Sequence, residues 1–161
     1  MIKKYILSVA VILGLFCLFN QNANAASKCT DGTPKVIRGC WITNNWSKDH
    51  KNKAYYSVTI TKSRITGEEH GIGIINGRKV CMSDQAVTQV SRAKYKTIKK
   101  NYFEVISRQN LTIASMTAFV KLIHKNGKEY ISIRNKGDNQ KVALMHRTSK
   151  KYIDKLNHYY L

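Results

Sequence analysis

His124 and Glu129 are the most suggestive pair of polar side chains in the sequence, because they flank an Asn126-Gly127 pair. A two-residue turn at Asn126-Gly127 would place them opposite each other across a hairpin. A carboxylate beside an imidazole can hold the ring in one tautomer, as a general base requires. With His146 added, the set would suit the two-histidine acid–base chemistry of a secreted ribonuclease. We favour the simpler interpretation, which is a solvated cross-strand pair beside two lysines.

Other motifs with chemical potential are few. The stretch Glu68 to His70 carries groups that could bind a metal, but it lies between Gly67 and Gly71 and is more simply a polar loop. HExxH, GxSxG, Walker and CxxC patterns are absent. The glycines from Gly71 to Gly77 have the wrong spacing for a dinucleotide-binding loop. We therefore expect no enzyme activity, no catalytic or metal-binding residues and no cofactor.

Positive charge is the strongest chemical signal. The chain holds 28 Lys and Arg residues against 9 Asp and Glu residues, a net charge of +19. Such an excess predicts attraction to anionic polymers or surfaces, with strong salt dependence. The charge is densest from Arg92 to Tyr102, where cations alternate with aromatic residues that could stack on bases. The residues expected to bind are Arg92, Lys94, Tyr95, Lys96, Lys99, Lys100 and Tyr102.

The limits of this basic tract are also clear. Nothing in it provides base readout, so we expect no sequence-specific nucleic acid as a partner. The expected partners are lipopolysaccharide, glycosaminoglycans, acidic lipids and extracellular DNA. Lys150, Lys151 and Lys155 form a second, smaller group of cations. The alternative interpretation is that the tract is an ordinary solvated loop.

The N-terminus has the order of a secretory signal peptide. Lys3 and Lys4 precede an uncharged apolar run from Tyr5 to Phe19, and an Ala-x-Ala pattern ends at Ala25. The run is shorter than the roughly 20 residues that span a bilayer. We therefore expect cleavage of residues 1–25, and an exported, periplasmic or extracellular domain of residues 26–161 without a transmembrane segment. Because residues 1–25 hold two lysines and no acid, that domain would carry a net charge of +17.

Three cysteines follow residue 25: Cys29, Cys40 and Cys81. Export permits a disulfide, and an odd count leaves one thiol over. The turn-rich loop between Cys29 and Cys40 makes that bridge locally easy, so we lean towards it. A bridge from Cys81 to either of the others would close a longer loop, and the sequence does not choose.

Hydrophobic residues recur with a period of two, which predicts an all-β domain. Asn76-Gly77 and Asn126-Gly127 predict two tight hairpins. At the second, the register would bring Leu122 opposite Ile131 and Val120 opposite Ile133 on a buried face. The expected strands are 36–43, 56–61, 72–75, 78–82, 85–91, 102–107, 111–118, 119–125, 128–134 and 141–147.

One helix is expected at the C-terminus, over residues 149–161. Ser149 can cap it, and its apolar side would carry Tyr152, Ile153, Leu156, Tyr159 and Tyr160. Because it ends the chain, we expect it to pack on the outside of the sheet.

The order of three landmarks resembles the lipocalins and the wider calycin group. Gly39-Cys40-Trp41 lies in an early strand, Arg147 ends the last strand, and the helix follows directly. The resemblance implies a single antiparallel barrel of about eight strands. It also implies that Trp41 closes one end of the barrel with Arg147 packed over its ring. Ile42 departs from the pattern, because an aromatic residue commonly follows the tryptophan, and the Thr-Asp pair of a late lipocalin loop is missing.

Three functions from different classes follow. The first is an exported, non-catalytic binding protein that holds a small apolar or amphipathic ligand in the barrel, as the resemblance implies. The second is a basic surface protein that binds polyanions or a host partner. The third is a secreted nuclease. Trp46, which follows Asn44-Asn45, is expected in a loop at the barrel's rim, where it would contact a ligand.

Overall fold

The computed structural model describes residues 29–44, 52–107, 116–137 and 144–158, with the backbone alone at 84–88. This part of the chain forms ten strands, a one-turn 3-10 helix and one α-helix. In chain order these are β1 (Thr30–Asp31), η1 (Lys35–Ile37), β2 (Gly39–Thr43), β3 (Lys53–Ile60), β4 (Ile65–Ile75), β5 (Arg78–Val90), β6 (Lys94–Lys99), β7 (Tyr102–Ile106), β8 (Thr117–Lys125), β9 (Lys128–Asn135), β10 (Leu144–Thr148) and α2 (Lys150–Leu156).

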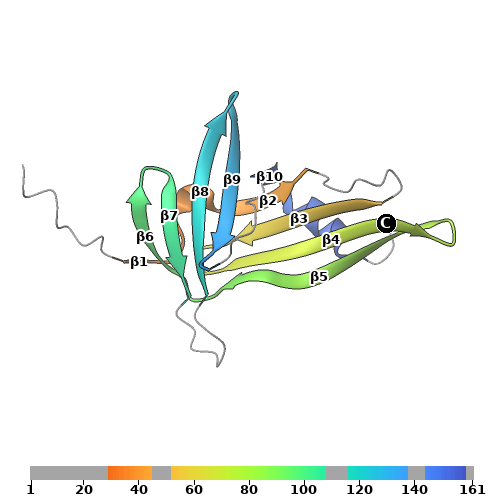
Figure 1. Ribbon diagram of the computed structural model, residues 1–161, viewed down its shortest axis with the longest axis horizontal. Helices are drawn as coiled ribbons and strands as arrows, with labels where there is room; N and C mark the ends of the chain where they lie inside the picture. The colour runs from red at the N-terminus through yellow and green to blue at the C-terminus, as the bar shows by residue number, and fades with distance from the viewer. Residues whose placement is uncertain (1–28, 45–51, 108–115, 138–143, 159–161) are drawn as a thin grey trace, which may run out of the picture.

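The ten strands form one antiparallel sheet, in the order β1-β6-β7-β8-β9-β10-β2-β3-β4-β5. The strands β6 to β9 stand steeply across the long ribbon of β3, β4 and β5, as Figure 1 shows. The all-β class and the C-terminal helix are therefore confirmed. The sheet has ten strands where about eight were expected, and among the described residues no backbone ladder joins its edge strands, β1 and β5.

Backbone hydrogen bonds at one corner hold the curled sheet in shape. The chain passes directly from β5 to β6, and Ala93 in this connection accepts from the N–H of Gly32 at 2.7 Å. Ala93 also donates to Ser63, and Thr33 donates to Lys62, at 3.0 and 2.8 Å. The segment after β1 and the β3–β4 turn are thereby fastened to the same corner. These bonds satisfy backbone groups that a continuous ladder would otherwise pair.

The buried apolar side chains form two clusters on opposite faces of the sheet. The larger lies inside the curl, and its fully buried members include Trp41, Val58, Ile131 and Met145. The smaller lies on the other side, called the outer face from here on, where helix α2 covers the sheet. Its buried members are Ile42, Ile72, Cys81, Ile153 and Leu156.

Both predicted Asn-Gly hairpins are formed, and the Asn126-Gly127 hairpin has the predicted register. Lys125 pairs with Lys128, His124 with Glu129, and Leu122 with Ile131, and Ile75 pairs with Arg78 at the other turn. Asn76, Gly77, Asn126 and Gly127 all have positive φ, between 50° and 73°. A turn with two such residues matches the right-handed twist of the strands it joins.

Several strand boundaries differ from the expected ones. The predicted strand 36–43 begins only at Gly39, because residues 35–37 form the 3-10 turn. The predicted strands 78–82 and 85–91 are one continuous strand, β5, which pairs along the whole of an eleven-residue β4. Residues 68–70, expected in a loop, lie in β4. Residues 111–115 and 141–143 lie outside the described residues.

Helix α2 begins where expected, since Ser149 accepts a hydrogen bond from the backbone N–H of Tyr152 at 3.1 Å. Ile153 and Leu156 are buried, as predicted, but Tyr152 is 41% exposed. Its expected place on the packed side is therefore wrong. Tyr159 and Tyr160, the expected signal peptide of residues 1–25 and Trp46 lie outside the described residues.

Candidate functional site: a cationic and aromatic face

Trp41 and Arg147 meet as the sequence pattern predicts. They are paired residues of β2 and β10, and the guanidinium carbon of Arg147 lies 4.2 Å from the centre of the Trp41 ring. Trp41 is fully buried, and its indole N–H donates to the carbonyl of Ile37 at 2.9 Å. Arg147 also donates to the carbonyls of Arg38 and Val36, at 2.9 and 3.1 Å. These contacts tie the segment before β2 to the last strand, which is a structural role.

Gly39 is required by this arrangement. It has φ +130°, and a Cβ atom built there would lie 2.8 Å from a guanidinium nitrogen of Arg147. Any other residue would have to adopt a strained backbone and displace the arginine. The glycine of the Gly-x-Trp pattern therefore makes room for the cation that covers the tryptophan.

The suspected acid–base pair, His124 and Glu129, does not form a close contact, because Glu129 binds Arg147 instead. Glu129 accepts a hydrogen bond from Nε of Arg147 at 2.6 Å, whereas Nδ1 of His124 lies 4.0 Å from the Glu129 carboxylate. His124 and Glu129 are both well exposed at the hairpin. His146 pairs with Tyr130, the neighbour of Glu129 along β9, so it projects from the opposite face of the sheet. The structure therefore does not bring the two histidines together.

The expected disulfide between Cys29 and Cys40 is not formed, and Cys29, Cys40 and Cys81 are all free thiols. The strand pairing gives the reason. Cys29 leads into β1, which pairs with β6, whereas Cys40 lies in β2 between β3 and β10. The Cys81 thiol has a different partner, because it donates a hydrogen bond to the carbonyl of Leu156 at 2.6 Å.

A buried polar cluster that the sequence analysis missed lies beneath the end of α2. His70 is 1% exposed, and its ring nitrogens lie 2.8 Å from the hydroxyls of Ser57 and Ser83. Because the Ser83 hydroxyl donates to the Leu156 carbonyl at 3.0 Å, it accepts from His70. The ring is then the neutral Nδ1–H tautomer, and its Nε2 accepts from Ser57.

The surroundings of His70 favour this neutral form. Loss of solvation on burial lowers the pKa of His70, and the Glu68 carboxylate, 3.9 Å from Nε2, opposes that effect only in part. Glu68 in turn accepts from the side-chain amide of Asn157 at 3.3 Å. With both ring nitrogens engaged, Ser57 buried and the Ser83 hydroxyl donating to the Leu156 carbonyl, the cluster fastens α2 to the sheet rather than presenting a nucleophile.

The basic tract of the sequence is mostly a strand, and it contributes to one continuous surface. Lys94 and Lys96 of β6 pair with Ile106 and Glu104 of β7 on the outer face. The registers of β7, β8 and β9 place further cations and aromatic side chains beside them. We call this surface the cationic face, and define it by Lys94, Lys96, Lys99, Tyr102, Phe119, Lys121 and Arg134.

Cations and rings alternate within this face. The ammonium of Lys99 lies 5.9 Å from the centre of the Tyr102 ring, and the guanidinium of Arg134 lies 5.6 Å from the centre of the Phe119 ring. The two rings are themselves 6.1 Å apart, tilted by 31°. Lys121 pairs with Tyr102 across the strands and is exposed. The aromatic side chains thus form a half-buried floor from which the cations project.

Two acids lie beside the described cations of this face. Glu104 is 3.8 Å from the ammonium of Lys96, and Asp31 of β1 pairs with Lys94 across the strands. Lys99, Lys121 and Arg134 are left in excess. Such an uncompensated group of cations concentrates the positive potential at one place on the surface.

The other predicted binding residues have different positions. Tyr95 points inward, with its ring edge against Phe103 at 6.2 Å and its side packed on the core, so its expected surface contact is corrected. Arg92 and Lys100 are exposed in the turns on either side of β6. Sequence reasoning missed Phe119 and Lys121, which the pairing of β8 with β7 brings to the tract, and Arg134, which the pairing of β9 with β8 adds.

Two further observations concern metal binding and membrane crossing by the described residues. Among them no group of three His, Cys, Asp or Glu side chains could hold a metal ion, and no helix has the length and apolar character needed to cross a membrane. Comparison of the chain with protein-family models, with curated proteins and with solved structures finds no match.

Proposed function

We propose that the protein binds anionic polymers through the cationic face. The observation that carries the proposal is the placement of Lys99, Lys121 and Arg134 on one side of neighbouring strands, around the rings of Tyr102 and Phe119. Lysine and arginine neutralise phosphate or sulfate groups, and each contact releases counterions from the polymer. The rings add flat apolar surface on which a base or a sugar can lie.

The chemistry of the polymer follows from the same residues. Their charges neutralise repeated anionic groups, and their aromatic rings can stack on any base, because every base has a flat face. The expected class is therefore polymers with repeated phosphate or sulfate groups, bound without sequence preference. Lipopolysaccharide, glycosaminoglycans and extracellular DNA belong to that class, and an exported protein would meet them.

Two alternative functions remain predictions from the sequence. A small apolar ligand within the curl of the sheet, as the lipocalin resemblance implies, would lie against Trp41 and its neighbours. Two hollows open on the outer face instead, one lined by Lys53, Ile72 and Lys79 and the other by Ile42, Tyr55 and Tyr152. A nuclease would need an accessible acid–base pair, and His124 and His146 lie on opposite faces.

Retention on a heparin column tests the proposal. The variant Lys99→Gln/Lys121→Gln/Arg134→Gln should elute at clearly lower salt than the unmodified protein. The matched control, Lys62→Gln/Arg64→Gln/Lys155→Gln, removes the same charge from exposed positions elsewhere and should elute close to the unmodified protein. Equal losses in the two variants would show that net charge alone governs retention, and would remove the cationic face as a site.

A further inference from the structure

The tip of the β4–β5 hairpin exposes apolar side chains to an unusual degree. Ile74 is 61% exposed, Ile75 46% and Met82 60%. This hairpin projects at the right-hand end of Figure 1, away from β6 and β7 at the left. Single exposed apolar residues are ordinary, but three within nine residues of one projecting hairpin mark an interaction surface.

These side chains lie on both faces of the hairpin. Ile74 pairs with Lys79 on the outer face, whereas Ile75 pairs with Arg78 on the other face, which Met82 shares. A flat protein partner would cover only one of the two faces. An apolar medium that surrounds the tip would cover both.

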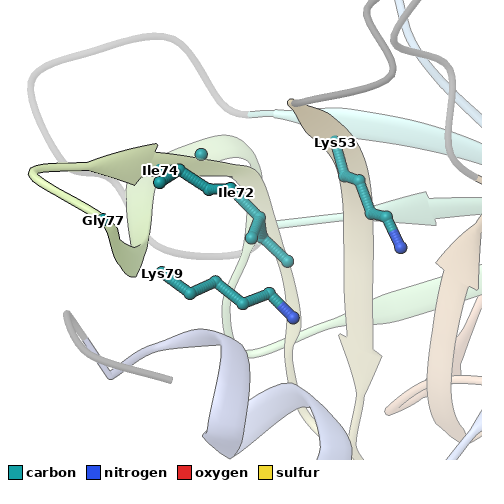
Figure 2. Close-up of a pocket in the computed structure, with 6 residues that line it drawn as sticks. Lys53, Ile72, Ile74, Gly77 and Lys79 are labelled. Carbon is teal, nitrogen blue, oxygen red and sulfur yellow. The ribbon is translucent and has the colours of Figure 1, made fainter.

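Cations surround the same apolar side chains. Lys53, Ile72, Ile74 and Lys79 line a hollow of about 250 Å³ on the outer face. Figure 2 shows the Ile72 side chain between those of Lys53 and Lys79. Arg78 adds a third exposed cation beside the turn. From Ile72 to Met82 the sequence contains no Asp or Glu.

We propose that the tip of the β4–β5 hairpin docks onto a bilayer that contains anionic lipids. Ile74, Ile75 and Met82 enter the interface between headgroups and acyl chains, and Lys53, Arg78 and Lys79 bind lipid phosphates. Charge complementarity supports this occupant, because three cations and no acid surround the apolar tip. A soluble polyanion would satisfy the cations but leave the isoleucines in water, so the hairpin fits a membrane better than a polymer.

The Asn76-Gly77 turn suits this role. Both of its residues are exposed, and a Cβ atom at Gly77 would meet nothing within 4 Å. The exposed turn can therefore lead the hairpin into the interface. This surface is separate from the cationic face, so either proposal can fail without the other.

Co-sedimentation of the full protein with vesicles tests the inference. Vesicles of phosphatidylcholine with one third phosphatidylglycerol should bind the protein, and pure phosphatidylcholine vesicles should bind it far less. Ile74→Ser/Ile75→Ser should lower the partition coefficient at least about tenfold, because burial of each isoleucine is lost at unchanged charge. Lys53→Gln/Lys79→Gln should lower it by roughly fivefold for each cation at low salt.

Controls separate this surface from others. Ile98→Ser removes a 48% exposed isoleucine from β6 and should leave partitioning unchanged. Ile74→Trp should strengthen it, which guards against loss of binding through misfolding. Ile74→Ser/Ile75→Ser should keep the heparin retention of the unmodified protein. Partitioning of Ile74→Ser/Ile75→Ser equal to that of the unmodified protein would overturn the proposal. So would a change in oligomeric state caused by that variant without any vesicle binding, because the tip would then pair with a second copy.

Discussion

The guanidinium of Arg147 lies over the indole ring of Trp41, 4.2 Å from its centre, and forms an ion pair with Glu129. Arg147 thus links the strand β10 to the buried ring of Trp41 and to the β8–β9 hairpin. A cation over an aromatic ring contributes on the order of 1 kcal/mol when partly desolvated. The larger contribution comes from the buried ring itself.

Truncation of the ring should therefore be the more damaging change. Trp41→Ala is expected to lower the free energy of unfolding by about 3–5 kcal/mol, as large buried aromatic residues do. Arg147→Met keeps much of the side chain's bulk and should cost less, about 1–2 kcal/mol, through its lost hydrogen bonds. Urea unfolding followed by tryptophan fluorescence or circular dichroism measures both. A smaller loss for Trp41→Ala than for Arg147→Met would contradict the assignment of Trp41 to the core.

The glycine beside this pair has its own test. Gly39→Ala should destabilise the protein by more than the roughly 1–2 kcal/mol that a left-handed conformation costs, because the new methyl group would also displace Arg147. Gly127→Ala is the matched control, since Gly127 has φ +70° and open space around it. Thermal unfolding of the two variants should separate them by several degrees. Equal melting temperatures would show that Arg147 moves aside without cost.

Stability should depend on pH through His70. Its pKa is lower in the folded protein than in the unfolded chain, chiefly because of burial. The unfolded state therefore binds the proton first as the pH falls below about 6.5, and stability decreases as the pH drops through that window. Above about pH 7 both states are neutral at this residue and the effect vanishes. Melting temperatures from pH 7.5 to 5 measure it.

Two variants identify His70 as the source of that dependence. His70→Gln should lower the melting temperature at pH 7.5 and flatten its decrease towards pH 5. Glu68→Gln removes the charge that favours the imidazolium, so its decrease should be steeper than that of the unmodified protein. An unchanged pH profile in both variants would assign the effect to other groups.

The thiols should differ in reactivity. Burial raises the pKa of the Cys81 thiol against the smaller opposing effects of Ser83 and Lys79, and the thiol donates to the Leu156 carbonyl. Cys81 should therefore react with a thiol reagent only after unfolding, whereas Cys29 and Cys40 are half-buried and should react in the folded protein. Alkylation followed by peptide mass spectrometry measures this order. A Cys29–Cys40 bridge in the protein purified without reductant would contradict the three free thiols.

Local signals in the sequence were sufficient for the hairpins and the helix cap. Asn126-Gly127 determines a register with few alternatives, so the pairing of Val120 with Ile133 could be predicted. Ser149 is adjacent to the helix that it caps. The placement of Arg147 over Trp41 came from a resemblance in the order of motifs, because their pairing is far apart in sequence and no local rule provides it.

Other features depend on distant contacts or contradict local propensity. The strand β6 was missed because its lysines alternate with few apolar residues, and only Tyr95 points to the core. Lysines on such a strand are reasonable, since β1 pairs only with Tyr95 and Lys94 and leaves the rest of β6 at the sheet edge. The His70 cluster was missed because its hydroxyl partners, Ser57 and Ser83, each lie 13 residues away on neighbouring strands.

The salt dependence of polymer binding tests the central claim most directly. Affinity for a fluorescent heparin fragment or a single-stranded DNA oligomer is measured between 50 and 200 mM salt, and its logarithm is plotted against the logarithm of the salt concentration. Lys99→Gln/Lys121→Gln/Arg134→Gln should reduce the magnitude of the slope by about two to three, because each lost contact no longer releases counterions. The control Lys62→Gln/Arg64→Gln/Lys155→Gln should leave the slope nearly unchanged. Equal slopes for the two variants, or binding that does not respond to salt, would contradict polymer binding at the cationic face.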